Sequence, residues 1–175
     1  MTLGDDGLAA PFQLRYNQFM LPYTYKICFL FTHPKMNLTE VRDTLSKIPD
    51  LKPGRLMNFG DQRTTPKGRP LEGTYTASRW GFSFDEDRSW HNSDLERFPV
   101  AITSLLVKLL PFKDYLNELS RRGCSLRLIL SIGVDSNTGD TLTPTQLAAL
   151  SDLSMGLGLD LYPPDPPADP STPQQ

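Results

Sequence analysis

The stretch Tyr23–Thr32, "YTYKICFLFT", predicts the fold more clearly than any other part of the chain. Every second residue is aromatic or aliphatic, which is the pattern of a β-strand with one buried face. These residues are Tyr23, Tyr25, Ile27, Phe29 and Phe31. The opposite face would carry Lys26, Cys28 and Leu30, and is neither fully apolar nor fully charged. Such a strand is typical of an antiparallel sheet that helices cover on one face only, so we expect an α+β fold.

The next elements follow from spacing and capping residues. Residues 37–48 predict a helix, with Asn37 and Glu40 in the positions of a capping box. A short strand is expected near Arg55–Asn58, followed by a loop. The stretch Ser78–Phe84, "SRWGFSF", then predicts a strand in which Trp80, Phe82 and Phe84 share one face.

The second half of the chain continues the alternation of helices and strands. A long helix is expected from Ser93, which Glu96 would help to cap, with a break at Pro111 and an end at Gly123. The stretch Ser125–Val134, "SLRLILSIGV", alternates clearly and predicts a strand.

The last helix and strand complete the predicted order. Thr143, Pro144 and Gln146 are suited to the start of a helix, and Leu157–Tyr162 predicts the final strand. The order is β-α-β-β-α-β-α-β, which we interpret as a ferredoxin-like β-α-β-β-α-β core extended by one helix and one strand. Its open sheet face would present Lys26, Arg127, Asp160 and Tyr162.

Length and composition favour one folded domain over residues 12–162. The chain has 175 residues, 38% of them hydrophobic, and a formal net charge of −2. Residues 1–11 are expected to be flexible, and the proline-rich tail 163–175 has too few apolar groups to order itself. No secretory signal or membrane span is evident, and Cys28 and Cys124 are too few for a disulfide scaffold. We therefore predict a cytoplasmic protein without a membrane partner.

Catalytic and metal-binding patterns are weak. His33 and His91 have no second ligand at zinc spacing, and "DSNTGD" at residues 135–140 departs from a calcium loop. The acids of "FDEDRSWH", residues 84–91, are the best acid–base candidates, but they fall in a loop where carboxylates are normally solvated. No phosphate-binding glycine motif occurs. We predict no catalytic residue, no metal site, no cofactor and no enzymatic activity.

The loop between the second and third predicted strands is the most basic part of the chain. Residues 52–79 contain six lysines and arginines and two acids, a net charge of +6 − 2 = +4, although the whole chain is acidic. Three interpretations of Arg63, Lys67 and Arg69 are open: a solvated connection, a contact with an acidic protein, or a contact with RNA. The acidic net charge and the lack of an RNP motif argue against nucleic acid.

Residues Tyr23–Tyr162 resemble the family called domain of unknown function 4279. The resemblance rests on the first strand and helix, on Gly-Arg pairs at Gly54–Arg55 and Gly68–Arg69, on Trp80, and on the ending Asp160-x-Tyr162. The family has no established reaction, so the resemblance implies no catalytic residue.

These observations give a binding function as the leading hypothesis. Small α+β proteins of this kind include bacterial immunity proteins, which neutralise a cognate toxin by direct binding; this is an analogy of fold and size. The predicted contact residues are Arg63, Lys67 and Arg69 of the basic loop and Lys26, Arg127, Asp160 and Tyr162 of the open face. The alternative is a small-molecule or nucleotide-binding domain, with the possibility of an enzyme, whose pocket lies between loop and sheet.

Overall fold

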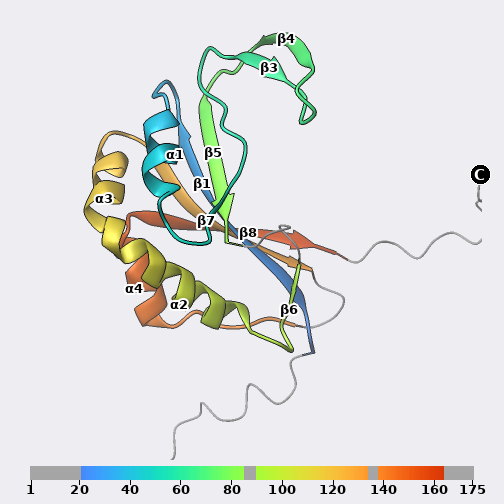
Figure 1. Ribbon diagram of the computed structural model, residues 1–175. Helices are drawn as coiled ribbons and strands as arrows, with labels where there is room; N and C mark the ends of the chain where they lie inside the picture. The colour runs from blue at the N-terminus through green and yellow to red at the C-terminus, as the bar shows by residue number, and fades with distance from the viewer. Residues whose placement is uncertain (1–20, 85–89, 134–137, 164–175) are drawn as a thin grey trace, which may run out of the picture.

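The computed structural model describes residues 21–84, 90–133 and 138–163 (Figure 1). The predicted flexible N-terminus, almost all of the proline-rich tail and the acids Asp85, Glu86 and Asp87 lie outside these residues. In chain order the elements are β1 (Thr24–His33), α1 (Thr39–Leu45), β2 (Lys52–Pro53), β3 (Gln62–Thr64), β4 (Pro70–Thr74), β5 (Ser78–Ser83), β6 (His91–Asn92), α2 (Phe98–Leu109), the 3-10 helix η3 (Leu110–Phe112), α3 (Lys113–Arg121), β7 (Ser125–Gly133), α4 (Pro144–Asp152) and β8 (Met155–Tyr162).

The main sheet has the strand order β2-β5-β1-β7-β8, with β6 pairing with the start of β1. β1 is antiparallel to both of its long neighbours, and its Phe31 lies opposite Trp80 on β5 and Leu126 on β7. Among the described strands, β7 and β8 form the one parallel pair, because α4 carries the chain back between them. The prediction of an α+β fold with a largely antiparallel sheet is confirmed.

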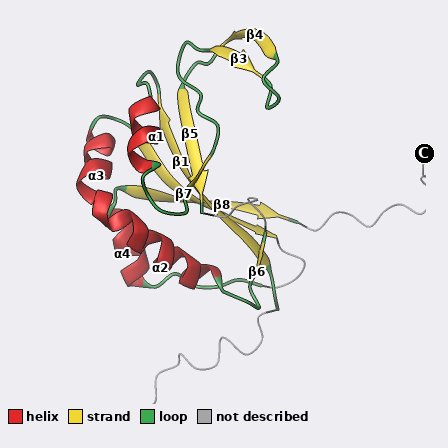
Figure 2. Cartoon of the chain, viewed as in Figure 1, coloured by secondary structure: helices red, strands yellow, loops and turns green. Residues whose placement is uncertain are grey.

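The helices pack against one face of this sheet (Figure 2). The four alternating residues of β1 and Tyr23 just before it belong to that core and are almost inaccessible to solvent, as predicted. Aromatic rings form its centre: Phe29 stacks on Phe82 with ring centroids 4.8 Å apart, and Phe31 lies 5.6 Å from Trp80. Burial of rings of this size dominates the energetics of a core.

The predicted start of the first helix lies within two residues of the observed one, whereas the predicted start of the second helix is wrong. α1 begins at Thr39 after Leu38, whose own side chain makes no cap. Asn37 binds this helix start as predicted, because its side-chain oxygen accepts a hydrogen bond of 2.8 Å from the backbone N–H of Thr39. α2 begins at Phe98 rather than at Ser93. The hydroxyl of Ser93 accepts a hydrogen bond of 2.8 Å from the backbone N–H of Tyr23, which fixes the chain beside β1.

Other helix signals are confirmed. Thr143 and Gln146 form the predicted capping box of α4, with Pro144 as its first residue. Pro111 lies in η3, which separates α2 from α3, and Gly123 has the positive φ of 87° that a turn after a helix requires.

The predicted loop between the second and third strands contains two strands of its own. β3 and β4 pair as an antiparallel hairpin that projects from the end of the sheet (Figure 1). The predicted strand near Arg55–Asn58 is wrong: β2 lies earlier, at Lys52–Pro53, and only Met57 of that stretch bridges to Arg79. Within the described part of the chain, none of the helices has the length and hydropathy needed to cross a membrane.

Candidate functional site

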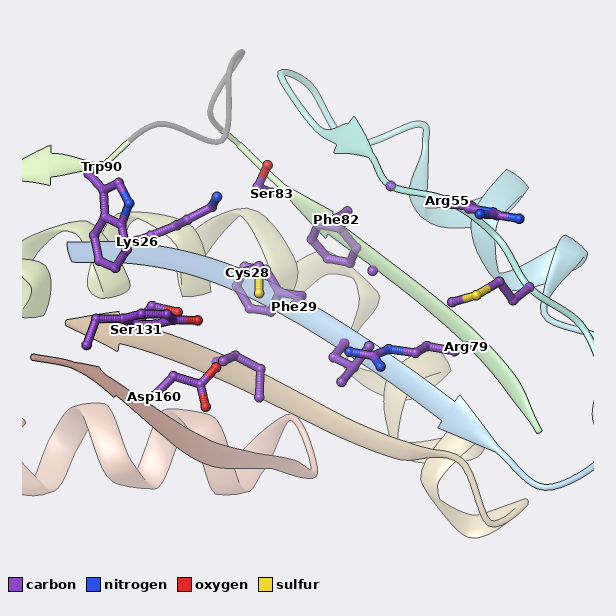
Figure 3. A pocket seen from close by; sticks show the side chains of 16 residues that line it. Lys26, Cys28, Phe29, Arg55, Arg79, Phe82, Ser83, Trp90, Ser131 and Asp160 are labelled. Carbon is purple, nitrogen blue, oxygen red and sulfur yellow. The ribbon is translucent and has the colours of Figure 1, made fainter. Parts of the chain in front are cut away.

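The open face of the sheet contains a hollow of about 650 Å³. Its floor consists of β1, β5, β7 and β8, and its rim includes the segment from Gly54 to Met57 and the side chain of Trp90 (Figure 3). Ligand sites in proteins typically have volumes of about 300–1,000 Å³, so the hollow has room for a small molecule or for several side chains of a partner.

Glycines and small residues make this part of the sheet concave. Gly81 lies opposite Leu30, and a Cβ atom at Gly81 would be 2.9 Å from the backbone oxygen of Phe29. Gly158 lies beside Ile129, whose Cδ1 atom would be 2.7 Å from a Cβ atom at Gly158. Ile129 therefore lies over Gly158, and Gly81 allows β5 to approach β1 closely at the floor of the hollow.

Cations outnumber carboxylates in the hollow. Lys26 of β1, Arg79 of β5 and Asp160 of β8 all line the hollow, and Figure 3 shows them spread over the open side of the sheet. Over residues 21–84, 90–133 and 138–163, none of these three side chains forms an ion pair. An excess of cations at a concave surface attracts an anionic ligand or an acidic surface.

Aromatic side chains form one end of the hollow. Trp90 and Tyr162 meet edge to face, with ring centroids 5.3 Å apart and an interplanar angle of 81°. Both rings remain about half exposed, Trp90 at 44% and Tyr162 at 50%. Exposed tryptophan and tyrosine rings offer large contact areas to a ligand at low cost in side-chain entropy.

Arg55 connects the rim of the hollow to the hairpin of β3 and β4. Its guanidinium group donates hydrogen bonds of 2.9 Å to the carbonyl oxygens of Thr64 and Thr65 and to the hydroxyl of Tyr75. A hydrogen bond with the Thr64 backbone lowers the pKa of that hydroxyl. Arg55 is therefore occupied by the hairpin, although it lines the hollow.

The predicted contact residues divide between two surfaces. Lys26, Asp160 and Tyr162 line the hollow. Arg127 lies on the same face beside a smaller depression of about 430 Å³ that also involves Gly156 and Gly158. The remaining three predicted residues, Arg63, Lys67 and Arg69, are exposed on the hairpin.

Arg79 and Trp90 are among the residues of the hollow that sequence reasoning missed. Arg79 of β5 points to the open face, because it alternates with Trp80 and Phe82, which point to the core. Strand alternation could therefore have placed Arg79 on the open face. Trp90 follows residues that the structure does not describe, and no periodic pattern in the sequence indicates its position.

The histidines and the second cysteine lie apart from the hollow. His33 accepts hydrogen bonds at Nδ1 from the backbone of Lys35 and Met36, and His91 stacks on Tyr25 with ring centroids 5.2 Å apart. Cys124 is buried, which raises the pKa of its thiol to about 11. Within the described residues, no group of three potential metal ligands comes together.

Asp140, from the stretch that superficially resembles a calcium loop, has a structural role. It accepts hydrogen bonds from the hydroxyl of Tyr23 at 3.1 Å and from Arg97 at 3.3 Å. Burial, together with this carboxylate, raises the pKa of Tyr23. Asp140 therefore connects the start of β1 to the segment before α2.

Comparison with protein-family models, with curated proteins and with solved structures found no match to the chain. The resemblance to domain of unknown function 4279 therefore stays a prediction from the sequence.

Proposed function

We propose that the chain is a non-catalytic binding protein that contacts an acidic protein partner through its hairpin and its open sheet face. The observation that carries this proposal is an excess of cations over carboxylates on two adjoining surfaces, among the residues that the structure describes. The hairpin presents Arg63, Lys67 and Arg69, and the adjoining hollow presents Lys26 and Arg79 without any ion pair to a described residue. Such a surface speeds encounter with an acidic partner, and arginine binds carboxylates with paired hydrogen bonds.

The two parts adjoin because the chain runs directly from one to the other. Gly54, Arg55 and Met57 belong to the rim of the hollow, and Arg55 binds the backbone of Thr64 and Thr65, where β3 enters the turn of the hairpin. One partner surface could therefore contact both parts. The exposed rings of Trp90 and Tyr162 would provide the apolar contacts that a largely charged interface needs.

Within this class, a bacterial immunity protein in the cytoplasm, blocking a cognate toxin, is the specific form that we propose. The support is an acidic chain with a locally basic surface and a small α+β architecture, which is an argument by analogy. We also propose that the first six main elements form a ferredoxin-like core. This is supported by the position of β1 between β5 and β7, antiparallel to both, with β2 beyond β5.

The test is binding to the protein encoded by the neighbouring gene, with titration calorimetry and rescue of cells that express it. The combined variant Arg63→Glu, Lys67→Glu, Arg69→Glu should weaken binding by at least about tenfold, since truncation of central contacts commonly costs that much. The matched control reverses three exposed cations near or on the helices: Lys35, Lys47 and Arg121. Equal binding by both triple variants would place the interface elsewhere, and a complete lack of binding to the neighbour would remove the immunity function.

A second candidate function, binding of a small anionic molecule, is favoured by the volume of the hollow. A planar aromatic anion such as a nucleotide could meet Trp90 with its ring and Lys26 or Arg79 with its charged group. In a Trp80→Phe variant, Trp90 is the sole tryptophan, so its fluorescence would report occupancy. Quenching by AMP that Lys26→Glu abolishes would support this candidate, and unchanged fluorescence at millimolar AMP would count against it.

A further inference from the structure

β8 forms an edge of the main sheet, and the described residues leave its outer side unpaired. In Figure 3 it is the outermost strand, beyond β7. It is eight residues long, and its outer backbone N–H and C=O groups form a row that another strand could pair with.

This edge lacks the features that usually protect edge strands from pairing. Residues Met155–Tyr162 contain no proline, lysine or arginine, and Asp160 is their only charge. Three leucines of the strand are exposed: Leu157 at 37%, Leu159 at 60% and Leu161 at 64%. Exposed leucines on an unpaired edge indicate a surface that is covered in the working form of the protein.

We infer that β8 pairs antiparallel with β8 of a second copy of this chain, with Leu159 of each copy on the two-fold axis. We choose a second copy as the partner of β8 because the strand is complementary to itself in this register, on both faces of the sheet. Closed two-fold symmetry of this kind is the commonest arrangement of protein dimers.

On the helix-covered side of the sheet, the register places leucine against leucine. Leu159 lies opposite Leu159 of the second copy, and Leu157 lies opposite its Leu161. The neighbouring residues on β7 are also apolar, since Leu128, Leu130 and Ile132 are aligned with the three leucines of β8. The exposed leucines would therefore join two existing apolar rows into one.

On the open side, the same register places each large residue against a glycine. Asp160 lies opposite Gly158 of the second copy, and Tyr162 lies opposite its Gly156. The two carboxylates are thereby kept apart. Arg127 is aligned with Gly156 on the neighbouring strand, so its side chain faces Tyr162 of the second copy across a residue without a side chain.

Other registers are less favourable. Opposite residues of an antiparallel pair share a face, so a shift of one position would place leucines of one copy against open-face residues of the other. Centring the pair on Asp160 would bring two like charges together, which is destabilising. Centring it on Gly158 would place two glycines at the axis, where they make no side-chain contact.

The sharpest test is disulfide trapping in a Cys28→Ser, Cys124→Ala background. Directly opposite residues have Cα atoms about 4.5–5.5 Å apart, which suits a disulfide. Leu159→Cys should therefore form a covalent dimer on mild oxidation, whereas Leu157→Cys and Leu161→Cys, each opposite an unchanged leucine, should remain largely monomeric. Equal cross-linking of all three variants would overturn the register.

The second test measures mass by light scattering and sedimentation from about 1 µM to about 1 mM, which covers common dimer affinities. The unmodified chain should dimerise, and Leu159→Lys should raise the dissociation constant by about 30-fold or more, the effect of a central contact. Leu95→Lys is the control, because Leu95 is 90% exposed and lies before α2. A monomer over the whole range would overturn the proposal, and slow amide exchange in β8 of that monomer would show that another segment of the same chain covers the edge.

Discussion

The two faces of the sheet are built from the same strands but have opposite characters. Toward the helices, β1 presents Tyr25, Phe29 and Phe31, which are at most 1% exposed. Toward solvent, the same strand presents Lys26 and Cys28, which line a concave surface. One alternating stretch of sequence therefore specifies the core on one side and the candidate binding surface on the other.

The difference teaches that stability and binding can be changed separately in this molecule. Side chains on the helix face are close-packed, so their loss leaves a cavity. Side chains on the open face contact solvent on one side, so their substitution changes charge and shape more than packing. The following predictions test how complete this separation is.

The largest effect is expected from Phe29→Ala on the helix face. Phe29 is fully buried and contacts Phe82 and Phe84, so its removal should lower the free energy of unfolding by about 3–5 kcal/mol. Urea unfolding followed by circular dichroism measures this. Leu30→Ala, the adjacent open-face position, is the control and should cost about 1 kcal/mol. Similar losses for both variants would contradict the separation of the two faces.

The next largest effect is expected from Gly81→Ala, where the open face is not independent of the core. The added methyl group would be 2.9 Å from the backbone oxygen of Phe29, so a strand must shift, at a cost of about 1–3 kcal/mol. Gly158→Ala would meet only the terminal carbon of Ile129, which can rotate away, and should cost less. Thermal unfolding of the two variants compares them; an equal cost would show that the backbone contact is not the cause.

A smaller effect is expected from pH, through Cys124 in the core. Burial raises the pKa of its thiol from 9.0 to about 11. Below pH 9 the thiol is protonated in both the folded and the unfolded chain, and between pH 9 and 11 only the unfolded chain loses the proton. Stability should therefore fall with rising pH, by at most about 1.4 kcal/mol per pH unit from this group.

Urea unfolding between pH 8 and pH 11 measures this dependence. Cys124→Ala should reduce the slope without removing it, because Tyr23 also has a raised pKa. The matched variant is Cys28→Ser on the open face. If Cys124→Ala left the slope unchanged, the thiol would not be responsible for the loss.

The smallest effect on stability is expected from Lys26→Gln in the hollow. Lys26 has no ion pair among the residues that the structure describes, so the free energy of unfolding should change by less than about 0.5 kcal/mol. The proposed functions require that the same variant weaken binding of the acidic partner or of AMP. A stable variant with unchanged binding of both would separate Lys26 from the site.

The sequence predicts those parts of the fold in which a local sequence pattern is not overridden by a contact with a distant part of the chain. The alternation in β1, β5 and β7 is undisturbed, and the three residues that start α4 agree with one another. The start of α2 could not be predicted in this way. Ser93 has the sequence context of a cap, but its hydroxyl is used by the backbone of Tyr23, 70 residues away in the chain.

The hairpin and the hollow were harder to predict for a different reason. All residues of β4 are exposed, so burial imposes no alternation that would reveal the strand. The hollow depends on which segments border the sheet, namely residues near Arg55 and Trp90, and on glycines whose role appears only when their neighbours are known. The open-face positions of Lys26, Asp160 and Tyr162 could be predicted because they depend on strand phase alone.

Arg55 links the hairpin to the hollow, so movement of one can affect the other. Its guanidinium group donates hydrogen bonds to the hairpin where β3 enters the turn, and the same residue lines the hollow. A partner that displaced the hairpin would also displace Arg55 at the hollow, and a ligand bound in the hollow would restrain the hairpin. By thermodynamic reciprocity, binding at the hairpin would change the free energy of binding in the hollow by the same amount as the reverse. Arg55 would then couple the two binding events.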